Sequence, residues 1–117
     1  VSGMFRIESI PLFSKNIAKG DLISVEDDDG KLYFEDLLEE SGNSTVSIVI
    51  LDANNADCII RKLGFEVSSE RYDKFFSVNI PSQLNYQKVK NELISLCEAG
   101  SVDYRESCIS SVHRQQI

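Results

Sequence analysis

The second half of the chain alternates between strand-like and helix-like hydrophobic patterns, and the order of these patterns constrains the fold more than any other feature. The β-branched run over 45–51 is the strongest strand signal, and residues 65–69, 74–80 and 102–106 are also expected to be strands. Apolar residues recur at helical spacing over 53–63 and 86–97. The order β-α-β-β-α-β predicts an α+β fold with a split β-α-β, ferredoxin-like core, in which right-handed crossovers place both helices on one face of the sheet.

The residues before this core predict a smaller strand-rich unit. Runs over 4–10, 20–25 and 31–37 are typical of strands. Asp-Gly at residues 29–30 indicates a tight hairpin, because glycine readily adopts the positive φ of such turns, and residues 26–29 are expected at its tip.

These patterns define the expected domain boundaries. Residues 1–109 form one α+β domain, with a strand-rich N-terminal unit over 4–42 and the ferredoxin-like core over 43–109. Residues 110–117 are polar and have no hydrophobic period, so they are expected to be a frayed tail.

Residues 21–40 carry a net charge of −8 and the rest of the chain +1, which together give the chain's net charge of −7. Lys31 is the one base of this segment, and the remaining residues of the chain are close to neutral. A compact anionic patch attracts cationic partners and is repelled by nucleic acid and by anionic membranes, so neither is expected as a ligand. The carboxylates of the segment are Asp21, Glu26, Asp27, Asp28, Asp29, Glu35, Asp36, Glu39 and Glu40.

The cysteines and the hydropathy favour a cytoplasmic protein. Cys58, Cys97 and Cys108 are odd in number and widely spaced, and the chain has no Cys-x-x-Cys pair. No apolar run approaches the length of a membrane span, and the first residues lack the features of a signal peptide.

The acidic segment does not match a calcium loop. If Gly30 is aligned with the glycine of an EF-hand, Val25 falls at the first ligand position and Asp36 at the position of the bidentate glutamate. Strands, and not helices, are expected on both sides. We therefore expect no metal centre.

The sequence also gives no sign of an enzyme or of a cofactor. The single histidine, His113, lies in the expected tail, where it would be solvated and unable to serve as a base for a serine or cysteine. Paired carboxylates suit glycoside hydrolysis by residue type, but they need one apolar and one polar environment, whereas a dense acidic run is more simply a solvated face. Residues 41–45 lack the lysine and the following helix of a phosphate cradle, so a loop with local hydrogen bonds is expected.

Three short motifs lie in order in the first half of the chain: Arg6-Ile7-Glu8-Ser9-Ile10-Pro11, Gly20-Asp21 and Ser41-Gly42-Asn43-Ser44-Thr45. Together they resemble an uncharacterised bacterial domain family with an Arg-Val-Glu-Ser-like opening strand, a Gly-Asp step and a Gly-Asn-Ser-Thr segment before a strand. The resemblance implies no catalytic residues. Small acidic bacterial proteins of this kind resemble antidotes encoded beside polymorphic toxins, including those of contact-dependent inhibition systems.

We therefore expect a cytoplasmic immunity protein that is monomeric when free and binds a cognate cationic toxin, of the nuclease class, in a 1:1 complex. If Leu32 and Phe34 point inward together with Asp36, then Tyr33 and Glu35 point outward as a contact pair. The expected toxin-binding residues are Asp27, Asp28, Asp29, Tyr33, Glu35, Asp36, Glu39 and Glu40.

Two alternatives remain open. The chain could be a small-ligand-sensing regulatory module of ferredoxin-like type. An obligate homodimer in solution would favour this alternative. The acidic hairpin tip could also serve only to weaken edge-to-edge pairing of strands between copies.

Overall fold

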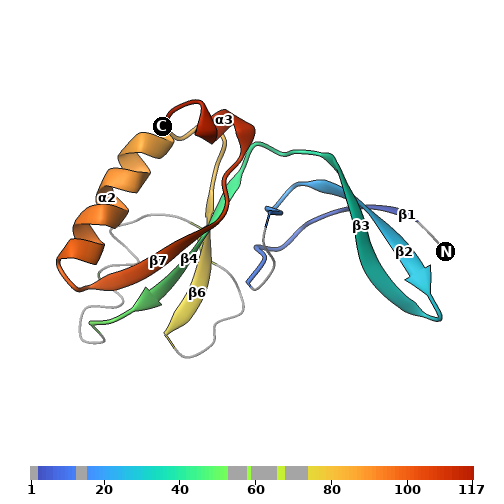
Figure 1. The fold of residues 1–117 in the computed structure, drawn as a ribbon, viewed down its shortest axis with the longest axis horizontal. Coiled ribbons are helices and arrows are strands. Elements are labelled where there is room, and N and C mark those ends of the chain that lie inside the picture. Colours follow the sequence, from blue (N-terminus) through green and yellow to red (C-terminus); the bar gives the residue numbers. More distant parts are fainter. Residues whose placement is uncertain (1–2, 13–15, 53–57, 59–65, 68–73) are drawn as a thin grey trace.

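The computed structural model describes residues 3–12, 16–52, 58, 66–67 and 74–117, which form two antiparallel sheets and the helices α2 (Tyr86–Glu98) and α3 (Ser111–Arg114) (Figure 1). The α+β class predicted from the sequence is confirmed. The molecule is flat and elongated, with extents of 48 × 32 × 17 Å, because the N-terminal sheet projects to one side of the rest (Figure 1). None of the described helices is long and apolar enough to cross a membrane.

The projecting sheet consists of β1 (Gly3–Arg6), β2 (Leu22–Asp28) and β3 (Lys31–Glu39) in the order β1-β2-β3, and we call it the arm. The predicted hairpin is confirmed. The predicted opening strand over 4–10 is too long, since β1 ends at Arg6.

The tip of the hairpin is shorter than predicted. β2 and β3 pair as far as Asp28 and Lys31, so the turn consists of Asp29 and Gly30 alone. Both turn residues have positive φ, 55° and 85°, as a two-residue turn of the right twist requires. The carboxylate of Asp27 accepts a hydrogen bond from the Gly30 N–H at 3.0 Å. Residues 26–28 therefore belong to the strand, where their side chains alternate between the two faces.

The second sheet has the order β5-β6-β4-β7, formed by β4 (Ser44–Ile50), β5 (Glu66–Val67), β6 (Phe75–Ile80) and β7 (Val102–Cys108). All its neighbouring strands are antiparallel. Consequently β4 and β5 run parallel with β6 between them, and β6 and β7 run parallel with β4 between them. Of the predicted helix over 53–63, which would be the first crossover, only Cys58 is among the described residues, and it is helical.

One face of this sheet forms the hydrophobic core with α2. Asn85 caps the helix by accepting the Lys88 N–H at 3.2 Å, and Gly100 follows its end with φ of 78°. The helix covers alternate residues of the strands, as its predicted apolar face requires. The core residues are Val46, Ile48, Ile50, Phe76, Val78, Ile80, Tyr86, Val89, Leu93 and Val102.

The opposite face of the sheet is partly covered by the segment that joins β1 to β2. Ser47 Oγ lies 2.6 Å from Ser107 Oγ, and the Asn16 N–H donates to the Ser107 carbonyl at 3.0 Å. Ile10 and Ala18, from the joining segment, are buried. The strand-rich unit and the core are thus packed together at the base of the arm.

The prediction of a frayed C-terminal tail is wrong. Residues 110–117 were expected to fray, but Ser110 caps α3 by accepting the His113 N–H at 3.2 Å. His113 itself is fully buried. The segment has no hydrophobic period, and the polar contacts of Ser110 and His113 help to hold it in place.

Candidate functional site

The arm is a sheet with two different faces. The register pairs Val25 with Phe34 and Asp27 with Leu32, and it pairs Glu26 with Tyr33. Directly paired residues share a face, so each face can be read from the pairs. The acidic face carries Glu26, Asp28, Tyr33, Glu35, Asp36 and Glu39, and the apolar face carries Phe5, Ile23, Val25, Leu32, Phe34 and Leu37.

A β-bulge sets this division. The register shifts between Ser24 and Val25, because their partners, Asp36 and Phe34, are separated by the extra residue Glu35. Ser24 Oγ donates to Glu35 Oε1 at 3.3 Å, which places Glu35 on the acidic face. The predicted face shared by Leu32, Phe34 and Asp36 is therefore wrong: the bulge moves Asp36 to the side of Tyr33 and Glu35.

The condition that Leu32 and Phe34 point inward is not met. Their side chains are 59% and 55% exposed, and Phe5 is 49% exposed. Only Val25, at the middle of the arm, is well covered, with 7% exposure. The ring of Phe5 lies across Gly3, where a Cβ would stand 3.2 Å from it. Within the described residues, no second layer covers this apolar face.

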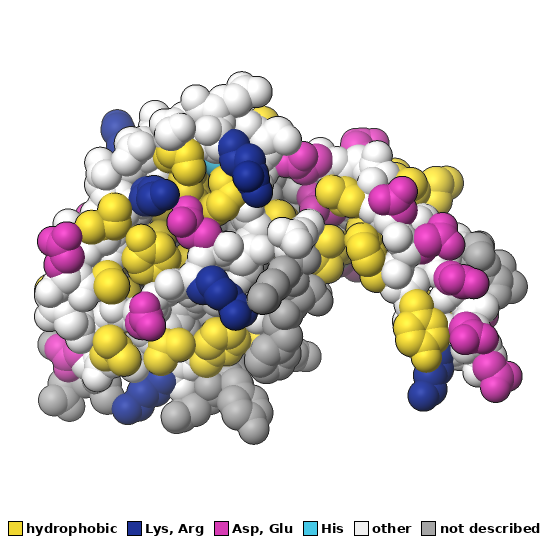
Figure 2. Space-filling model, in the orientation of Figure 1, with side chains coloured by type: hydrophobic (Ala, Val, Ile, Leu, Met, Phe, Trp, Pro, Cys, Tyr) yellow, Lys and Arg dark blue, Asp and Glu magenta, His cyan; other side chains and the backbone are white. Residues whose placement is uncertain are grey.

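The expected toxin-binding residues divide into four groups. Asp28, Tyr33, Glu35, Asp36 and Glu39 lie together on the acidic face. Asp27 is on the opposite face beside Leu32, and Asp29 is in the turn. Figure 2 shows acidic side chains gathered along the arm, whereas both signs of charge are spread over the core.

Glu40, the last of the expected binding residues, holds α3 against the arm. Its carboxylate accepts hydrogen bonds from the backbone N–H and from the hydroxyl of Ser111, the latter at 3.0 Å. These contacts occupy both carboxylate oxygens. Glu40 therefore contributes to the attachment of the arm and not to its acidic face.

Asp21, counted with the acidic segment, is buried and not displayed. Its side chain is 1% exposed, and its two oxygens accept the N–H groups of Ala18 at 2.8 Å and Ser41 at 2.9 Å. A buried carboxylate needs such donors, since it has lost its hydration. Asp21 thus ties the start of β2 to the end of the arm.

The loop before β4 makes the predicted local hydrogen bond, in which Ser41 Oγ accepts the Asn43 N–H at 3.1 Å, and it makes long-range contacts as well. Ser41 Oγ and Asn43 Nδ2 both donate to the Lys19 carbonyl at 2.9 Å, and Asn43 Oδ1 accepts the Ser82 N–H at 3.0 Å. Gly42, with φ of 90°, approaches Ser82 so closely that a Cβ would stand 2.9 Å from Ser82 Cβ. The Gly-Asp and Gly-Asn-Ser-Thr motifs therefore meet at the junction of arm and core.

His113 forms a buried pair with Ser44, which sequence reasoning missed. The Nε2 atom lies 3.1 Å from the Pro81 carbonyl, which can only accept, so Nε2 carries the proton. Nδ1 then accepts the Ser44 hydroxyl at 2.6 Å, and Ser44 Oγ in turn accepts the Ser110 N–H at 2.9 Å. The ring stacks on Tyr86 with centroids 5.1 Å apart.

This pair has the atoms of a nucleophile and its base, but its geometry suits a structural role. Ser44 and His113 are both fully buried, so neither presents an atom to a substrate. Burial lowers the pKa of His113, which keeps the ring neutral. The Ser-x-x-His pattern of residues 110–113 at the start of a short helix was the only local signal for this site.

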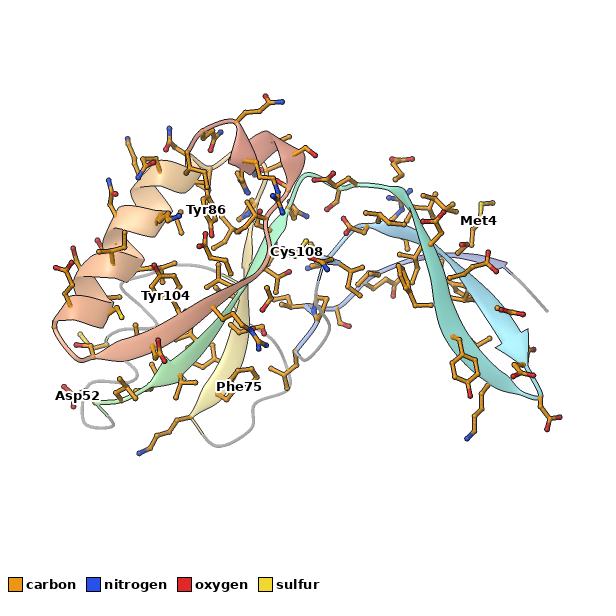
Figure 3. All side chains as sticks on the ribbon, viewed as in Figure 1. Met4, Asp52, Phe75, Tyr86, Tyr104 and Cys108 are labelled. Carbon is orange, nitrogen blue, oxygen red and sulfur yellow. The ribbon has the colours of Figure 1, made fainter. Side chains whose placement is uncertain are left out.

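Two hollows accompany these features. One, of about 180 Å³, lies at the junction and includes Asp21, Cys108 and Arg114. Burial raises the pKa of the Cys108 thiol to about 11, aided by the negative charges of Asp21 and Glu40, so the thiol is protonated and unreactive at neutral pH. Figure 3 shows Cys108 at the junction, far from Met4 on the arm.

The other hollow, also of about 180 Å³, lies on the open face of the second sheet. Val49, Phe75, Tyr104 and Arg105 line it. Within the described residues, no group of histidine, cysteine and carboxylate side chains could hold a metal ion.

Comparisons with known proteins place the chain in a family. The profile of a domain of unknown function, DUF4265, matches residues 1–104. The chain belongs to this family. The DUF4265 match includes the whole arm and the start of β7, so arm and core are parts of one domain type.

A solved structure supports the fold. A hypothetical protein from Neisseria gonorrhoeae is 33% identical, with a TM-score of 0.79, over 92% of this chain and 77% of that chain. No curated protein matches the chain. The resemblance to an uncharacterised domain family is thus confirmed, and the name DUF4265 carries no activity.

Proposed function

We propose that this DUF4265 domain is a protein-binding module that recognises a cationic partner protein through the acidic face of its arm. One observation carries the proposal: five exposed carboxylates share one face of a sheet that projects from the core. Opposite potentials raise association rates well above the roughly 10⁵–10⁶ M⁻¹s⁻¹ of neutral pairs. A projecting sheet also lets a large partner approach without contact with the core.

The narrower form of the proposal is the immunity function. A nuclease toxin lines its active site with lysine and arginine for the phosphate backbone, and an acidic face would compete for these groups. In this form the protein acts in the cytoplasm as a 1:1 inhibitor with a ferredoxin-like core. Support for it comes from charge and not from the family or from the gonococcal protein.

A small-ligand sensor is the second candidate, and the hollow beside Phe75 and Arg105 favours it. Its volume of about 180 Å³ is below the roughly 300–1,000 Å³ of typical ligand pockets. A ligand there would be no larger than a single ring or a small acid. We therefore place this function behind protein binding.

If the gene beside this one encodes a cationic protein, that protein is the binding probe for the test. The triple variant E26K/D28K/D36K reverses charge on the acidic face, and its matched control E8K/E98K/D103K reverses three exposed carboxylates outside the arm. Both variants change the net charge from −7 to −1.

The arm variant should lower the association rate constant at least about tenfold and flatten its dependence on salt, while the control stays within about twofold. Equal losses in the two variants would show that net charge alone acts, which contradicts the proposal. For the immunity form, coexpression should relieve growth arrest by the neighbouring protein only when the acidic face is intact.

A further inference from the structure

The outer strand of the arm has an unpaired edge. β3 is at one side of the sheet order β1-β2-β3 and pairs with β2 alone. Among the described residues, no backbone hydrogen bond reaches the other edge of β3. Eight of its nine side chains are exposed and the ninth is half-buried. An extended chain can therefore approach this edge along its length.

The edge is most regular at the outer end of the arm. Residues 31–34 pair with β2 without a shift, whereas the bulges at Glu35 and Leu38 interrupt the later part. Along this regular stretch, Lys31 and Tyr33 lie on the acidic face, and Leu32 and Phe34 lie on the apolar face. Any strand added here would continue both faces of the sheet.

We propose that residues 31–34 of β3 pair with an extended strand of the partner protein, in which basic and apolar residues alternate. The inference rests on the proposed function and names the chemistry of the contact. Backbone hydrogen bonds would supply register, and the two faces would supply specificity.

The charges decide which residues the added strand needs on the acidic face. A side chain opposite Tyr33 on the added strand lies two strands from Glu26, the β2 partner of Tyr33, because β3 lies between them. A lysine or arginine there would pack over the Tyr33 ring and face the carboxylates of Glu35 and Asp36 on the same strand. Lys31, the other residue of this face within 31–34, has Asp28 as its partner on β2, which offsets its charge. An acidic residue at the same position would be repelled.

The opposite face needs apolar residues at the alternate positions. Leu32 and Phe34 are more than half exposed, and an apolar neighbour on an added strand would cover their edges. Burial of this surface stabilises the contact by roughly 25 cal/mol per Å². Because side chains alternate along a strand, one extended segment meets both requirements only if basic and apolar residues alternate.

A second copy of this chain is a poor occupant of the edge. Pairing β3 with β3 would join two acidic faces into one continuous sheet face that carries Glu35, Asp36 and Glu39 of both copies on its two central strands. Like charges on neighbouring strands are destabilising. The same carboxylates that discourage self-pairing favour a basic strand.

The experiment measures three seven-residue peptides of identical composition against the full-length protein. The first alternates four lysines with three valines. The second carries the lysines and valines in two blocks. The third repeats the alternating sequence but is N-methylated at two successive central nitrogens, so that both of its edges are blocked while its charge is kept. Dissociation constants come from fluorescence anisotropy at low salt, and amide exchange in β3 is followed by NMR.

The alternating peptide should bind at least tenfold more tightly than either of the others and should slow amide exchange within residues 31–34. Equal binding of the three peptides, binding without protection of β3, or no binding at all overturns the inference. The variant E26K/D28K/D36K separates the two proposals. If the wild type binds the three peptides equally and the variant binds none of them, strand addition fails and the acidic interface stands. If the variant binds the peptides as tightly as the wild type does, the acidic interface fails.

Discussion

The core and the arm use the same alternation of residues and reach opposite degrees of burial. In the core, Ile48 and Phe76 are fully buried because α2 forms a second layer over their face. In the arm, Leu32 and Phe34 are more than half exposed because the described residues provide no second layer. Strand alternation fixes which side chains share a face, but the neighbouring layer decides whether that face becomes a core or a surface. The exposed apolar residues of the arm are thus available to a partner.

The sharpest test of this difference truncates one leucine in each region. Leu93→Ala removes a fully buried side chain of α2 and should lower the free energy of unfolding by about 2–5 kcal/mol, because it leaves a cavity. Leu32→Ala, in the arm, should change it by less than about 0.5 kcal/mol. Chemical denaturation monitored by circular dichroism measures both.

A loss above 2 kcal/mol for Leu32→Ala would show that the arm's apolar face is covered in solution. The denaturant slope serves as the control, since an unchanged slope shows that each variant unfolds between the same two states.

The core was predictable from the sequence because its signals are local and repeated. Residues close together in the chain indicate the hydrophobic period of α2, its cap at Asn85 and the β-branched run that forms β4. The Asp29-Gly30 turn is equally local, because both residues readily adopt positive φ.

The candidate site was less predictable because its decisive features are not local. The bulge at Glu35 has no sequence signature, yet it transfers Asp36 to the other face. The burial of His113 depends on Ser44 and Pro81, which are 69 and 32 residues away. The charge pattern of the sequence assigns Asp21 to the exposed anionic patch, but its carboxylate is buried, and one of its two hydrogen-bond donors, the Ser41 N–H, is 20 residues away. Such contacts become visible only when the chain is folded.

Replacing the glycine at the junction should lower the free energy of unfolding more than replacing the glycine at the tip of the arm. Gly42→Ala adds a Cβ at 2.9 Å from Ser82 Cβ to a backbone with φ of 90°, so we expect a loss of about 2–4 kcal/mol. Gly30→Ala also has positive φ, but no atom lies within 4 Å of the new Cβ, so the loss should be about 1–2 kcal/mol.

Thermal and urea unfolding of the two variants compare these losses. The ordering is the critical result: a Gly30→Ala loss equal to or larger than that of Gly42→Ala would mean that the junction does not hold the loop as tightly as its contacts indicate.

The smallest expected effect is a pH dependence that belongs to the core and not to the arm. His113 is the only histidine, and burial holds its pKa in the folded state below the unfolded value of about 6.5. As the pH falls below about 6.5, the unfolded chain takes up this proton first, so the free energy of unfolding decreases until the folded-state pKa is reached. The slope cannot exceed about 1.4 kcal/mol per pH unit for one group. His113→Gln should flatten the dependence of the free energy of unfolding on pH between pH 7 and 5.5, an interval above the usual titration of carboxylates. The amide exchange of β2 and β3, corrected for the intrinsic effect of pH, should stay unchanged over this interval. An unaltered slope in this variant would show that another group controls the acid sensitivity and that the Ser44–His113 pair tolerates protonation.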